Sequence, residues 1–427
     1  MRDAINLTRR LGLQYIWIDS LCIIQDDPED WKREAKSMAS VYEKALLTLA
    51  ATAADDRAGL FAQSNLHDLA TLPHNAQDPR SPPVYFTAHT AQPHGWDRHI
   101  LNAPLNSRAW VMQERLLSRR IVHFACDQLC WECRLQRSSQ TGITYADNTS
   151  SAFSMIQRQS PANADRYLIA NADVHSFITN MQELLSKHGT KISSDRSLRG
   201  AFGHLWMTLI EAYAHCNLTG LAVRLQAAAG ISHIYGHWFH GLVPLMPLLL
   251  WYAPGHAAWK KDDGARPNGG GLTRPRRQRC PTWSWASMDG GVSFLTRFEY
   301  ESFATLVAVE TAARDGLDVH ASLIFRGCVF KARRVDARNQ SADGDCVSGE
   351  RLGRVFFDVD DEEQEIFDCI IMCRGDMQHE GENYRVLALK EVGSQSGAWP
   401  EFRRIGVGTF NPDLVTSSVG EMRFALV

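Results

Sequence analysis

The sequence predicts an α/β domain at the N-terminus, a mainly helical region in the middle and a β-rich region at the C-terminus. Three observations predict this order: a helix–strand–helix–strand pattern within the first 51 residues, helical patterns between residues 160 and 250, and short β-prone runs from about residue 300 onward. Alternating helices and strands are typical of an α/β sheet, and a series of short strands is typical of a sandwich or partial barrel.

The first predicted elements are a helix over residues 2–11 and a strand over residues 14–19. Gly12 follows the helix, and glycine is favoured just past a helix end. Tyr15–Ile18 is a continuous apolar run that ends at the carboxylate of Asp19. Such a run is typical of a strand that is buried on both faces of a parallel sheet.

A second helix and a second strand follow. Asp27 is a favourable N-cap, and Pro28 occupies the first helical position, where its missing N–H has no cost. Apolar residues then recur at spacings of three or four, from Trp31 to Ala45, which predicts one buried helix face. Residues 46–51 are the predicted second strand.

Composition and breaker residues divide the rest of the chain. Residues 62–105, rich in Pro, His, Asp and Gln, indicate a long loop, and Arg108–Arg134 indicates a compact block that contains a strand at Arg120–Phe124. The predicted boundaries are an N-terminal domain at 1–135 without its first strand, a linker at 136–160, a mainly helical region at 161–252, a loop at 253–280 and a β-rich region at 281–427.

Charge and hydropathy exclude several function classes. The 427 residues carry a formal charge of −3 and a pI near 6.6, so no global positive field recruits nucleic acid. The longest apolar run, Gly241–Tyr252, is too short to span a bilayer, and Met1–Asn6 lacks the apolar core of a signal peptide. We therefore expect a cytoplasmic protein with reduced thiols, no membrane span and no nucleic-acid partner.

Three segments carry a family resemblance. Tyr15–Asp27, Pro104–Arg120 and Pro281–Gly290 resemble, in order and spacing, the signatures of fungal heterokaryon-incompatibility (HET) domain proteins. The residues that match these motifs outside the candidate site are Trp17, Cys22, Gln25, Glu34, Tyr42, Trp283 and Trp285. The resemblance implies non-self recognition and programmed cell death triggered by an unknown protein. It also implies a first strand, similar to Tyr-x-Ala-Leu-Ser-Tyr-x-Trp-Gly, which does not precede Met1.

The HET domain is distantly similar to the Toll/interleukin-1 receptor (TIR) domain, which implies a flavodoxin-like parallel sheet. Some TIR domains cleave NAD with a glutamate in a Trp-x-x-x-Glu arrangement, and Trp110 and Glu114 have that spacing. Two residues four apart share one face of a helix. Glu114 is therefore the candidate catalytic residue, with NAD as a possible substrate and no cofactor. The alternative is a structural ion pair of Glu114 with Arg108 or Arg115.

The candidate substrate-binding residues are Trp110, Asp19, Gln113 and Arg108. Asp19 follows the predicted strand, where ligands bind in open α/β sheets, and so is a candidate contact for a ribose hydroxyl. Its alternative role is to cap the following turn. Gln113 has a loop-fixing role as its alternative. Cys22 is a candidate nucleophile by residue type, or else a small buried hydrophobe.

Two further patterns have structural alternatives. His123, Cys126, Cys130 and Cys133 superficially fit zinc, but alternate side chains of a strand point to opposite faces, so we predict structural cysteines and no metal site. Trp283 and Trp285 are two apart on a predicted strand, which places both indoles on one face for core packing.

The sequence thus leads to two hypotheses. In the first, self-association completes a site that cleaves NAD, and the domain is the effector of a death response. In the second, the domain is a catalytically inactive adaptor or remnant that acts by protein–protein contact. The Trp110–Glu114 spacing favours the first hypothesis.

Overall fold

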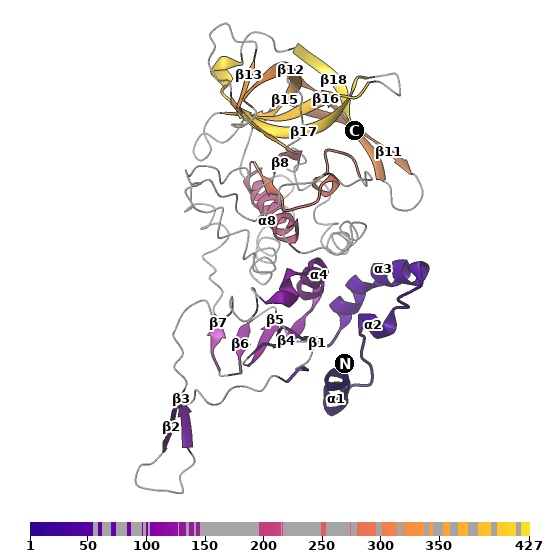
Figure 1. The fold of residues 1–427 in the computed structure, drawn as a ribbon, viewed down its shortest axis with the longest axis vertical. Helices are drawn as coiled ribbons and strands as arrows, with labels where there is room; N and C mark the ends of the chain where they lie inside the picture. The colour runs from indigo at the N-terminus through magenta and orange to yellow at the C-terminus, as the bar shows by residue number, and fades with distance from the viewer. Residues whose placement is uncertain are drawn as a thin grey trace. The chain divides into compact units, whose positions relative to one another are not determined.

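The computed structural model describes residues 1–53, 59–61, 70–73, 83–86, 96, 100, 103–126, 128–133, 136–140, 142–145, 196–214, 216, 249–252, 274, 280–295, 301–313, 319–336, 341–344, 353–358, 366–374, 383–393, 399–415 and 420–427. Within these ranges, the residues up to Tyr145 belong to one compact unit, and those from Arg196 onward belong to a second. Figure 1 shows the elements of both units.

The chain begins with helix α1 (Arg2–Arg10), as predicted. Arg9 and Arg10 lie in its last turn, where positive charge offsets the helix dipole. The helix ends before Gly12, whose φ of +71° lies in the left-handed region that favours glycine. Asp3 holds a later loop, because its carboxylate accepts a hydrogen bond from the Leu60 N–H at 3.0 Å.

The predicted buried strand at residues 14–19 is wrong. Residues 13–18 belong to no strand, and the Tyr15 side chain is 88% exposed. A strand is held by ladder hydrogen bonds to a neighbour, and no segment among the described residues pairs with this one. A short helix, α2 (Asp19–Cys22), begins where the strand was expected to end, and the Asp19 side chain accepts from the Ser20 N–H at 2.7 Å.

Helix α3 (Pro28–Lys44) begins where the sequence predicts. The Asp27 side chain accepts hydrogen bonds from the N–H groups of Glu29 and Asp30, at 2.9 and 3.2 Å, and so satisfies two donors that a helix start leaves open. Met38 and Ala39 are buried on its inner face. Strand β1 (Thr48–Ala50) follows, within the predicted range 46–51.

The N-terminal sheet is mixed. Its strand order is β1-β4-β5-β6-β7, in which β1 and β4 are parallel and the remaining pairs are antiparallel. The elements after β1 are η3 (Pro104–Ser107), α4 (Ala109–Leu117), β4 (Arg120–Phe124), β5 (Leu129–Cys133), β6 (Arg137–Ser139) and β7 (Thr144–Tyr145). Strand β4 has the predicted bounds, whereas β6 and β7 extend the sheet into the segment predicted as a linker.

Two regions predicted as loop or helix contain strands. Strands β2 (Ala70–Pro73) and β3 (Pro83–Phe86) form a hairpin within the predicted long loop. In the predicted helical region, helix α8 (Arg196–Ala214) is followed by β8 (Trp251–Tyr252), which pairs with β9 (Ser293–Phe294). The other residues of 161–252, apart from Cys216 and the pair Leu249–Leu250, lie outside the described ranges.

The Pro281–Gly290 segment forms a turn and a short 3₁₀ helix, η6 (Trp285–Ser287), so the strand predicted there is wrong. Ser284 caps this helix by accepting from the Ala286 N–H at 3.3 Å, a local bond that competes with strand pairing. The two indoles therefore do not share a strand face. Both still pack on core clusters: Trp283 beside Leu249 and Leu250, and Trp285 edge-on to Tyr213 at 6.0 Å.

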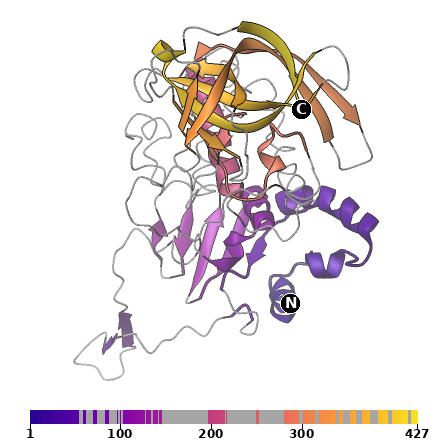
Figure 2. The same ribbon diagram turned by 45° about the horizontal axis from the view of Figure 1, so that its top comes forward.

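The C-terminal region is β-rich, as predicted. Its strands are β10 (Glu301–Ser302), β11 (Thr305–Ala313), β12 (Val319–Asp336), β13 (Ser341–Gly344), β14 (Gly353–Phe357), β15 (Ile366–Arg374), β16 (Tyr384–Glu391), β17 (Glu401–Phe410) and β18 (Gly420–Leu426), and a 3₁₀ turn, η7 (Pro412–Leu414), follows β17. In the described part of the sheet, the ladders β12–β15, β15–β16, β16–β17, β17–β14, β14–β13 and β13–β12 form a closed ring. Figure 2 shows these strands curving round.

Both faces of this closed sheet are buried. Along β16, Val386 and Ala388 belong to one hydrophobic cluster, while Leu387 and Leu389 belong to another, which also includes Leu249 and Leu250. This alternation follows from the two-residue period of a strand. Apolar runs without polar alternation, which the sequence contains here, are thus explained by burial on both faces.

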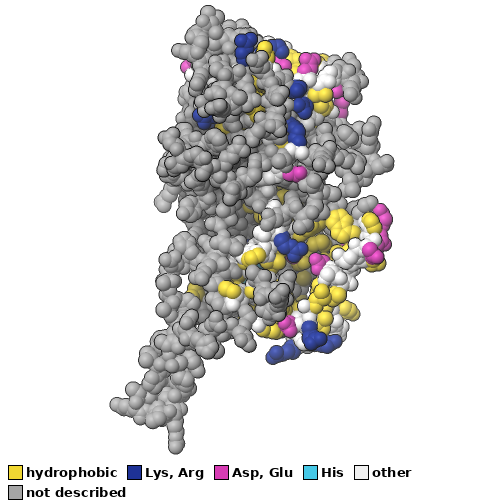
Figure 3. Space-filling view, in the orientation of Figure 1, with side chains coloured by type: hydrophobic (Ala, Val, Ile, Leu, Met, Phe, Trp, Pro, Cys, Tyr) yellow, Lys and Arg dark blue, Asp and Glu magenta, His cyan; other side chains and the backbone are white. Residues whose placement is uncertain are grey.

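The first unit exposes several large apolar side chains. Leu21, Ile24 and Leu46 are 58%, 56% and 59% exposed, in addition to Tyr15. Figure 3 shows yellow hydrophobic side chains over the part of this unit that contains α1 to α3. None of the helices in the described ranges is both long enough and apolar enough to cross a bilayer.

Candidate functional site

Residues from three elements meet around Glu114. Glu114 lies on α4, which packs against α3, and Tyr42 of α3 is near enough to influence the pKa of its carboxyl group. Asp19, at the start of α2, and Arg108, just before α4, are close enough to act on the Glu114 carboxylate through their charges. The structure therefore brings together three residues that the sequence proposed separately, and adds Tyr42.

The environment of Glu114 changes its ionisation. Its side chain is half-buried, and loss of water around it raises its pKa from 4.5 to about 7, despite the opposing effects of the Tyr42 hydroxyl and the Arg108 charge. The negative charge of Asp19 raises the pKa further. A carboxylate that ionises near neutrality is suited to acid–base or electrostatic catalysis.

Two edge-on aromatic pairs include residues of α3 and α4. The rings of Trp17 and Tyr42 meet edge-on with centroids 5.8 Å apart, and those of Trp31 and Trp110 do the same at 6.5 Å. Trp110 lies one helical turn before Glu114, as its spacing predicted. The indole pair thus joins α3 to α4 on the helix that carries the carboxylate.

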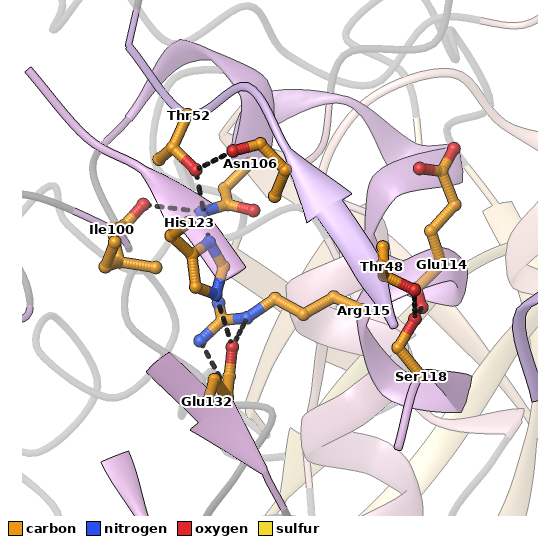
Figure 4. Close-up of polar contacts among 10 residues, drawn as sticks. Thr48, Thr52, Ile100, Asn106, Glu114, Arg115, Ser118, His123 and Glu132 are labelled. Carbon is orange, nitrogen blue, oxygen red and sulfur yellow. Dashed lines mark hydrogen bonds and ion pairs between the residues drawn. The ribbon is translucent and has the colours of Figure 1, made fainter. Parts of the chain in front are cut away.

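The next residue, Arg115, points to the opposite side of α4 and is buried (Figure 4). Its guanidinium binds Glu132 of β5 through two parallel bonds, from Nε to Oε2 at 2.8 Å and from Nη2 to Oε1 at 2.9 Å. His123 Nε2 of β4 lies 2.8 Å from the same Oε2 atom, and Thr52 Oγ1 lies 3.1 Å from His123 Nδ1. This network fixes α4 on the sheet.

Burial and the neighbouring groups determine the ionisation states of Glu132 and His123. Burial favours the neutral form of Glu132, but the Arg115 charge and the His123 hydrogen bond outweigh it and hold the pKa of Glu132 well below its ordinary value. Burial lowers the pKa of His123, so its ring is neutral. The neutral ring donates from Nε2 to Glu132, and its Nδ1 lies 3.1 Å from the Thr52 hydroxyl, which also donates to the Ala50 carbonyl at 3.2 Å.

The other end of α4 is tied to β1. The Ser118 hydroxyl donates to the Glu114 backbone carbonyl at 2.7 Å, and the Thr48 hydroxyl lies 2.7 Å from the Ser118 hydroxyl (Figure 4). Because the Ser118 proton is used, Thr48 is the donor in the second bond. Both bonds hold the backbone of Glu114 against the sheet, which limits the positions that its side chain can reach.

The structural alternative for Glu114 is an ion pair, and the geometry opposes it. Arg115 is committed to Glu132, on the other side of α4. Arg108 is exposed and, among the described residues, forms no ion pair with Glu114 within 4.0 Å, although its charge acts on that carboxylate. Among the described residues, Glu114 therefore has no ion pair within 4.0 Å, and Tyr42, Asp19 and Arg108 act on the pKa of its carboxyl group.

Comparison with known families identifies the region that contains this site. Residues 1–114 match the family model described as Heterokaryon incompatibility protein (HET). This part of the chain is a HET domain. Comparisons with curated proteins and with solved structures gave no match.

The other motif residues of the HET domain have structural contacts. Gln25 Nε2 donates to the backbone carbonyls of Ile23 and Asp19, at 2.9 and 3.2 Å, and so closes the loop between α2 and α3. Glu34 lies 3.9 Å from Arg33 Nε on the surface of α3. Cys22 is a free, exposed thiol, so the buried alternative for it is wrong.

Three further predicted site residues lie elsewhere. Gln113 is only 1% exposed, which leaves no surface for a ligand, and its Oε1 accepts no hydrogen bond from the described residues. Trp283 and Trp285 belong to the second unit and lie outside the HET domain.

The His123–Cys133 pattern forms no metal centre in the part of the chain that the structure describes. The antiparallel pair β4–β5 places His123 opposite Cys130, and both are buried, whereas Cys126 is exposed. The His123 ring nitrogens are used by Thr52 and Glu132 instead.

Sequence reasoning missed the buried Arg115–Glu132–His123 network and the effect of Tyr42 on the pKa of Glu114. The sequence does contain a signal for the network. His123 and Glu132 lie inside the predicted strand segments, and a buried ionisable side chain needs a hydrogen-bond or ion-pair partner. The position of Tyr42 relative to Glu114 depends on how α3 crosses α4, and no local pattern predicts a crossing angle between helices that are distant in sequence.

Proposed function

We propose that this heterokaryon-incompatibility-type protein is a cytoplasmic effector of non-self recognition and cell death that cleaves the bond between nicotinamide and ribose in NAD. The observation that carries this proposal is the half-buried Glu114 carboxyl group on α4, one helical turn after Trp110 and without an ion-pair partner within 4.0 Å among the described residues. Burial raises its pKa to about 7. The proposal also extends the likeness of HET domains to TIR domains, which the parallel pair β1–β4 and the helix α4 between these strands support.

The proposed chemistry needs one anion. The C1′–N bond of NAD breaks with its electron pair going to the pyridinium nitrogen, so nicotinamide leaves as a neutral molecule and needs no acid. The ribosyl fragment becomes an oxocarbenium-like cation, which the Glu114 carboxylate stabilises electrostatically. Water then attacks C1′ and releases a proton, which gives ADP-ribose.

The neighbouring side chains have matching roles in this proposal. The exposed Arg108 guanidinium binds the diphosphate through charge-assisted hydrogen bonds, and Asp19 accepts a hydrogen bond from a ribose hydroxyl. Trp110 stacks on a ring of the substrate or shields the cation from water. Arg115 and Glu132 make no contact with the substrate but keep α4 in place.

The test is incubation of the full chain with NAD and measurement of nicotinamide release. We expect release by the wild type, a loss of at least about 100-fold in Glu114→Gln, in keeping with the removal of one preorganised electrostatic group, and no change in the control Glu43→Gln. Glu43 is a half-buried carboxylate on α3 that lies outside the proposed machinery. Unchanged release by Glu114→Gln would refute the assignment of this residue.

Self-association is part of the proposal, and the exposed apolar side chains of the HET domain support it. Tyr15, Leu21 and Ile24 present apolar surface to solvent, and such surface favours protein–protein contact. Light scattering over a range of protein concentrations measures the mass, and we expect nicotinamide release per protomer to rise as the mass rises. Release that is independent of concentration and of mass would remove self-association from the mechanism.

A second candidate function is an inactive adaptor that acts by contact. The same exposed apolar side chains favour it, because an adaptor needs a binding surface and no reactive group. Absence of nicotinamide release by the wild type at every concentration would leave the adaptor as the explanation.

A further inference from the structure

Residues 14–18, which join α1 to α2 (Figure 1), form an apolar run that belongs to no strand. Ile18 already has strand-like dihedral angles, with φ −135° and ψ 122°, and the Tyr15 side chain is 88% exposed. Within the part of the chain that the structure describes, no N–H group of residues 14–18 donates to a backbone carbonyl. A row of unused backbone groups is a template on which another strand can pair.

We propose that residues 14–18 are a self-association site, which pairs antiparallel with the same residues of a second copy of this chain about a twofold axis at Ile16. Tyr, Ile and Trp are enriched in strands, and the second copy supplies the neighbour that a strand needs. The inference deepens the proposed function, because it names the surface through which the HET domain associates. It rests on that function only for its effect on nicotinamide release.

The segment is complementary to itself in this register. Two antiparallel copies centred on Ile16 place Tyr15 of each copy opposite Trp17 of the other. Aromatic side chains that lie opposite each other on neighbouring strands stabilise the pair. Residues 13–18 carry no charge, so the pairing brings no like charges together within the segment. The chemistry of the segment therefore fits a second copy of itself.

The carbonyl of Ile18 decides which residues exchange hydrogen bonds. It already accepts from the N–H groups of Leu21 and Cys22, at 2.9 and 2.8 Å, so it is not available to a second copy. Tyr15 and Trp17 therefore form the hydrogen-bonded pairs, and Ile16 lies in the intervening pair without hydrogen bonds. In such a pair the opposing Cα atoms are closest, about 4.5 Å apart, so the two Ile16 side chains meet at the axis.

The exposed apolar area determines how strong this association is. Ile16 is 36% exposed, and Leu21 and Ile24, which follow in sequence, are 58% and 56% exposed. Together with Tyr15 they offer at most about 400 Å² in each copy. Two copies then bury roughly 800 Å² of side chain, less than the roughly 1,200 Å² that is typical of stable complexes. We therefore expect a weak dimer whose population rises with protein concentration.

Amide hydrogen exchange in the full-length wild type tests the pairing without any substitution. It is measured at two concentrations, at which light scattering shows mainly monomer and mainly dimer. We expect exchange at Tyr15 and Trp17 to slow at least about tenfold in the dimer, while Ile16, whose N–H points away from the second copy, changes little. Protection of β1 in place of Tyr15 and Trp17 would overturn the proposal, because the edge of the sheet would then be the interface.

A pair of charge variants at the axis gives a second test. Ile16→Lys and Ile16→Glu each bring like charges together, so each alone should raise the Kd of the dimer at least about tenfold. An equal mixture of the two variants places opposite charges at the axis, and we expect the dimer mass to return. The matched controls are Leu46→Lys and Leu46→Glu, at a 59% exposed position between α3 and β1, which leave the dimer unchanged alone and mixed.

The outcomes separate this inference from the proposed function. Recovery of the dimer in the mixture without any nicotinamide release would support the pairing and refute NAD cleavage. An unchanged mass in either Ile16 variant, or no recovery in the mixture of folded variants, would overturn the pairing even if NAD is cleaved. If circular dichroism shows that a variant does not fold, the exchange of Tyr15 and Trp17 in the wild type decides the matter, and equal rates at both concentrations would refute the pairing.

Discussion

Two neighbouring residues of α4, Glu114 and Arg115, have opposite environments. Glu114 is half-buried, and burial raises its pKa to about 7, whereas Arg115 is buried and bound to Glu132 through two hydrogen bonds. Successive residues of a helix point about 100° apart, so one helix can hold a catalytic group on one side and its anchor on the other. The position of Glu114 therefore depends on the ion pair between Arg115 and Glu132.

At this scale we predict that Glu132→Gln destabilises the first unit by about 3–5 kcal/mol, because the buried Arg115 charge loses its partner. Amide hydrogen exchange in β4 and β5 measures the free energy of opening of this unit. The control Glu34→Gln, in a surface ion pair 3.9 Å long, costs no more than about 1 kcal/mol. Equal costs for the two variants would contradict the anchoring role of Glu132.

At the scale of elements, caps decide where helices begin. We predict that Asp27→Ala costs about 1 kcal/mol, because two N–H groups at the start of α3 lose their acceptor. The adjacent Asp26→Ala, which removes an exposed side chain, changes the opening free energy of α3 by less than about 0.5 kcal/mol. Hydrogen exchange of the first turn of α3 provides the measurement, and equal protection in the two variants would count against the cap.

The Pro281–Gly290 segment joins separate elements of the second unit. Thr282 Oγ1 accepts from the Arg404 N–H of β17 at 3.0 Å and donates to the carbonyl of Val427, while the Trp251 indole donates to the Trp283 carbonyl at 2.9 Å. Arg404 itself is buried, and its guanidinium lies 3.2 Å from the centre of the Trp251 ring. The motif is thus a structural link in the second unit.

We therefore predict that Thr282→Val destabilises the second unit by about 1–3 kcal/mol, because it leaves buried polar groups without partners. Hydrogen exchange in β17 and β18 measures this loss. Thr305→Val, at an exposed position of β11, is the matched control and changes the stability by less than about 0.5 kcal/mol.

The sequence predicted those elements whose signals are local. The cap at Asp27, the left-handed Gly12 and the apolar runs of β12, β14, β15 and β16 each depend on a few adjacent residues. The strand at residues 14–19 failed because an apolar run becomes a strand only when another strand pairs with it. The strand predicted at Trp283 and Trp285 is wrong because Ser284 caps a short 3₁₀ helix there, a possibility that the sequence analysis did not consider.

The candidate site was predicted in part. The helical spacing placed Trp110 and Glu114 on one helix, and the resemblance singled out Glu114. The effect of Tyr42 on Glu114 and the anchoring of Arg115 by Glu132 were not predictable, since both involve residues far apart in sequence. Gln113 was a candidate substrate-binding residue, but its side chain on α4 is buried in the core.

At the scale of the whole molecule, the shifted carboxyl groups determine how stability depends on pH. Glu114 keeps its proton up to about pH 7 when folded and releases it near pH 4.5 when unfolded, so its contribution to the stability of the first unit decreases as the pH rises through that window. Glu132 and His123 have lowered pKa values when folded, so their contributions are lost on acidification, through pH 6.5 for His123 and below about 4.5 for Glu132.

The difference between wild type and Glu114→Gln isolates the first effect. We predict that the glutamine variant gains stability relative to the wild type between about pH 5 and 8, by roughly 2–3 kcal/mol, because an amide has no charge to desolvate. Hydrogen exchange in β4 and β5 at pH 5 and pH 8, corrected for intrinsic rates, measures the gain. A difference that does not change with pH would show that Glu114 titrates normally.

Strand β12, which has 18 residues, pairs with four other strands, and this limits the insertions and deletions that it can accept. It pairs with β11, β13, β15 and β18 along different parts of its length. Because strand side chains alternate between faces, deleting Cys328 would turn every later β12 side chain to the opposite face and shift two ladders at once. Length variants should therefore be tolerated in the connecting turns and not in this strand, which a scan of single-residue deletions through residues 319–336 would reveal as a continuous block of insoluble protein.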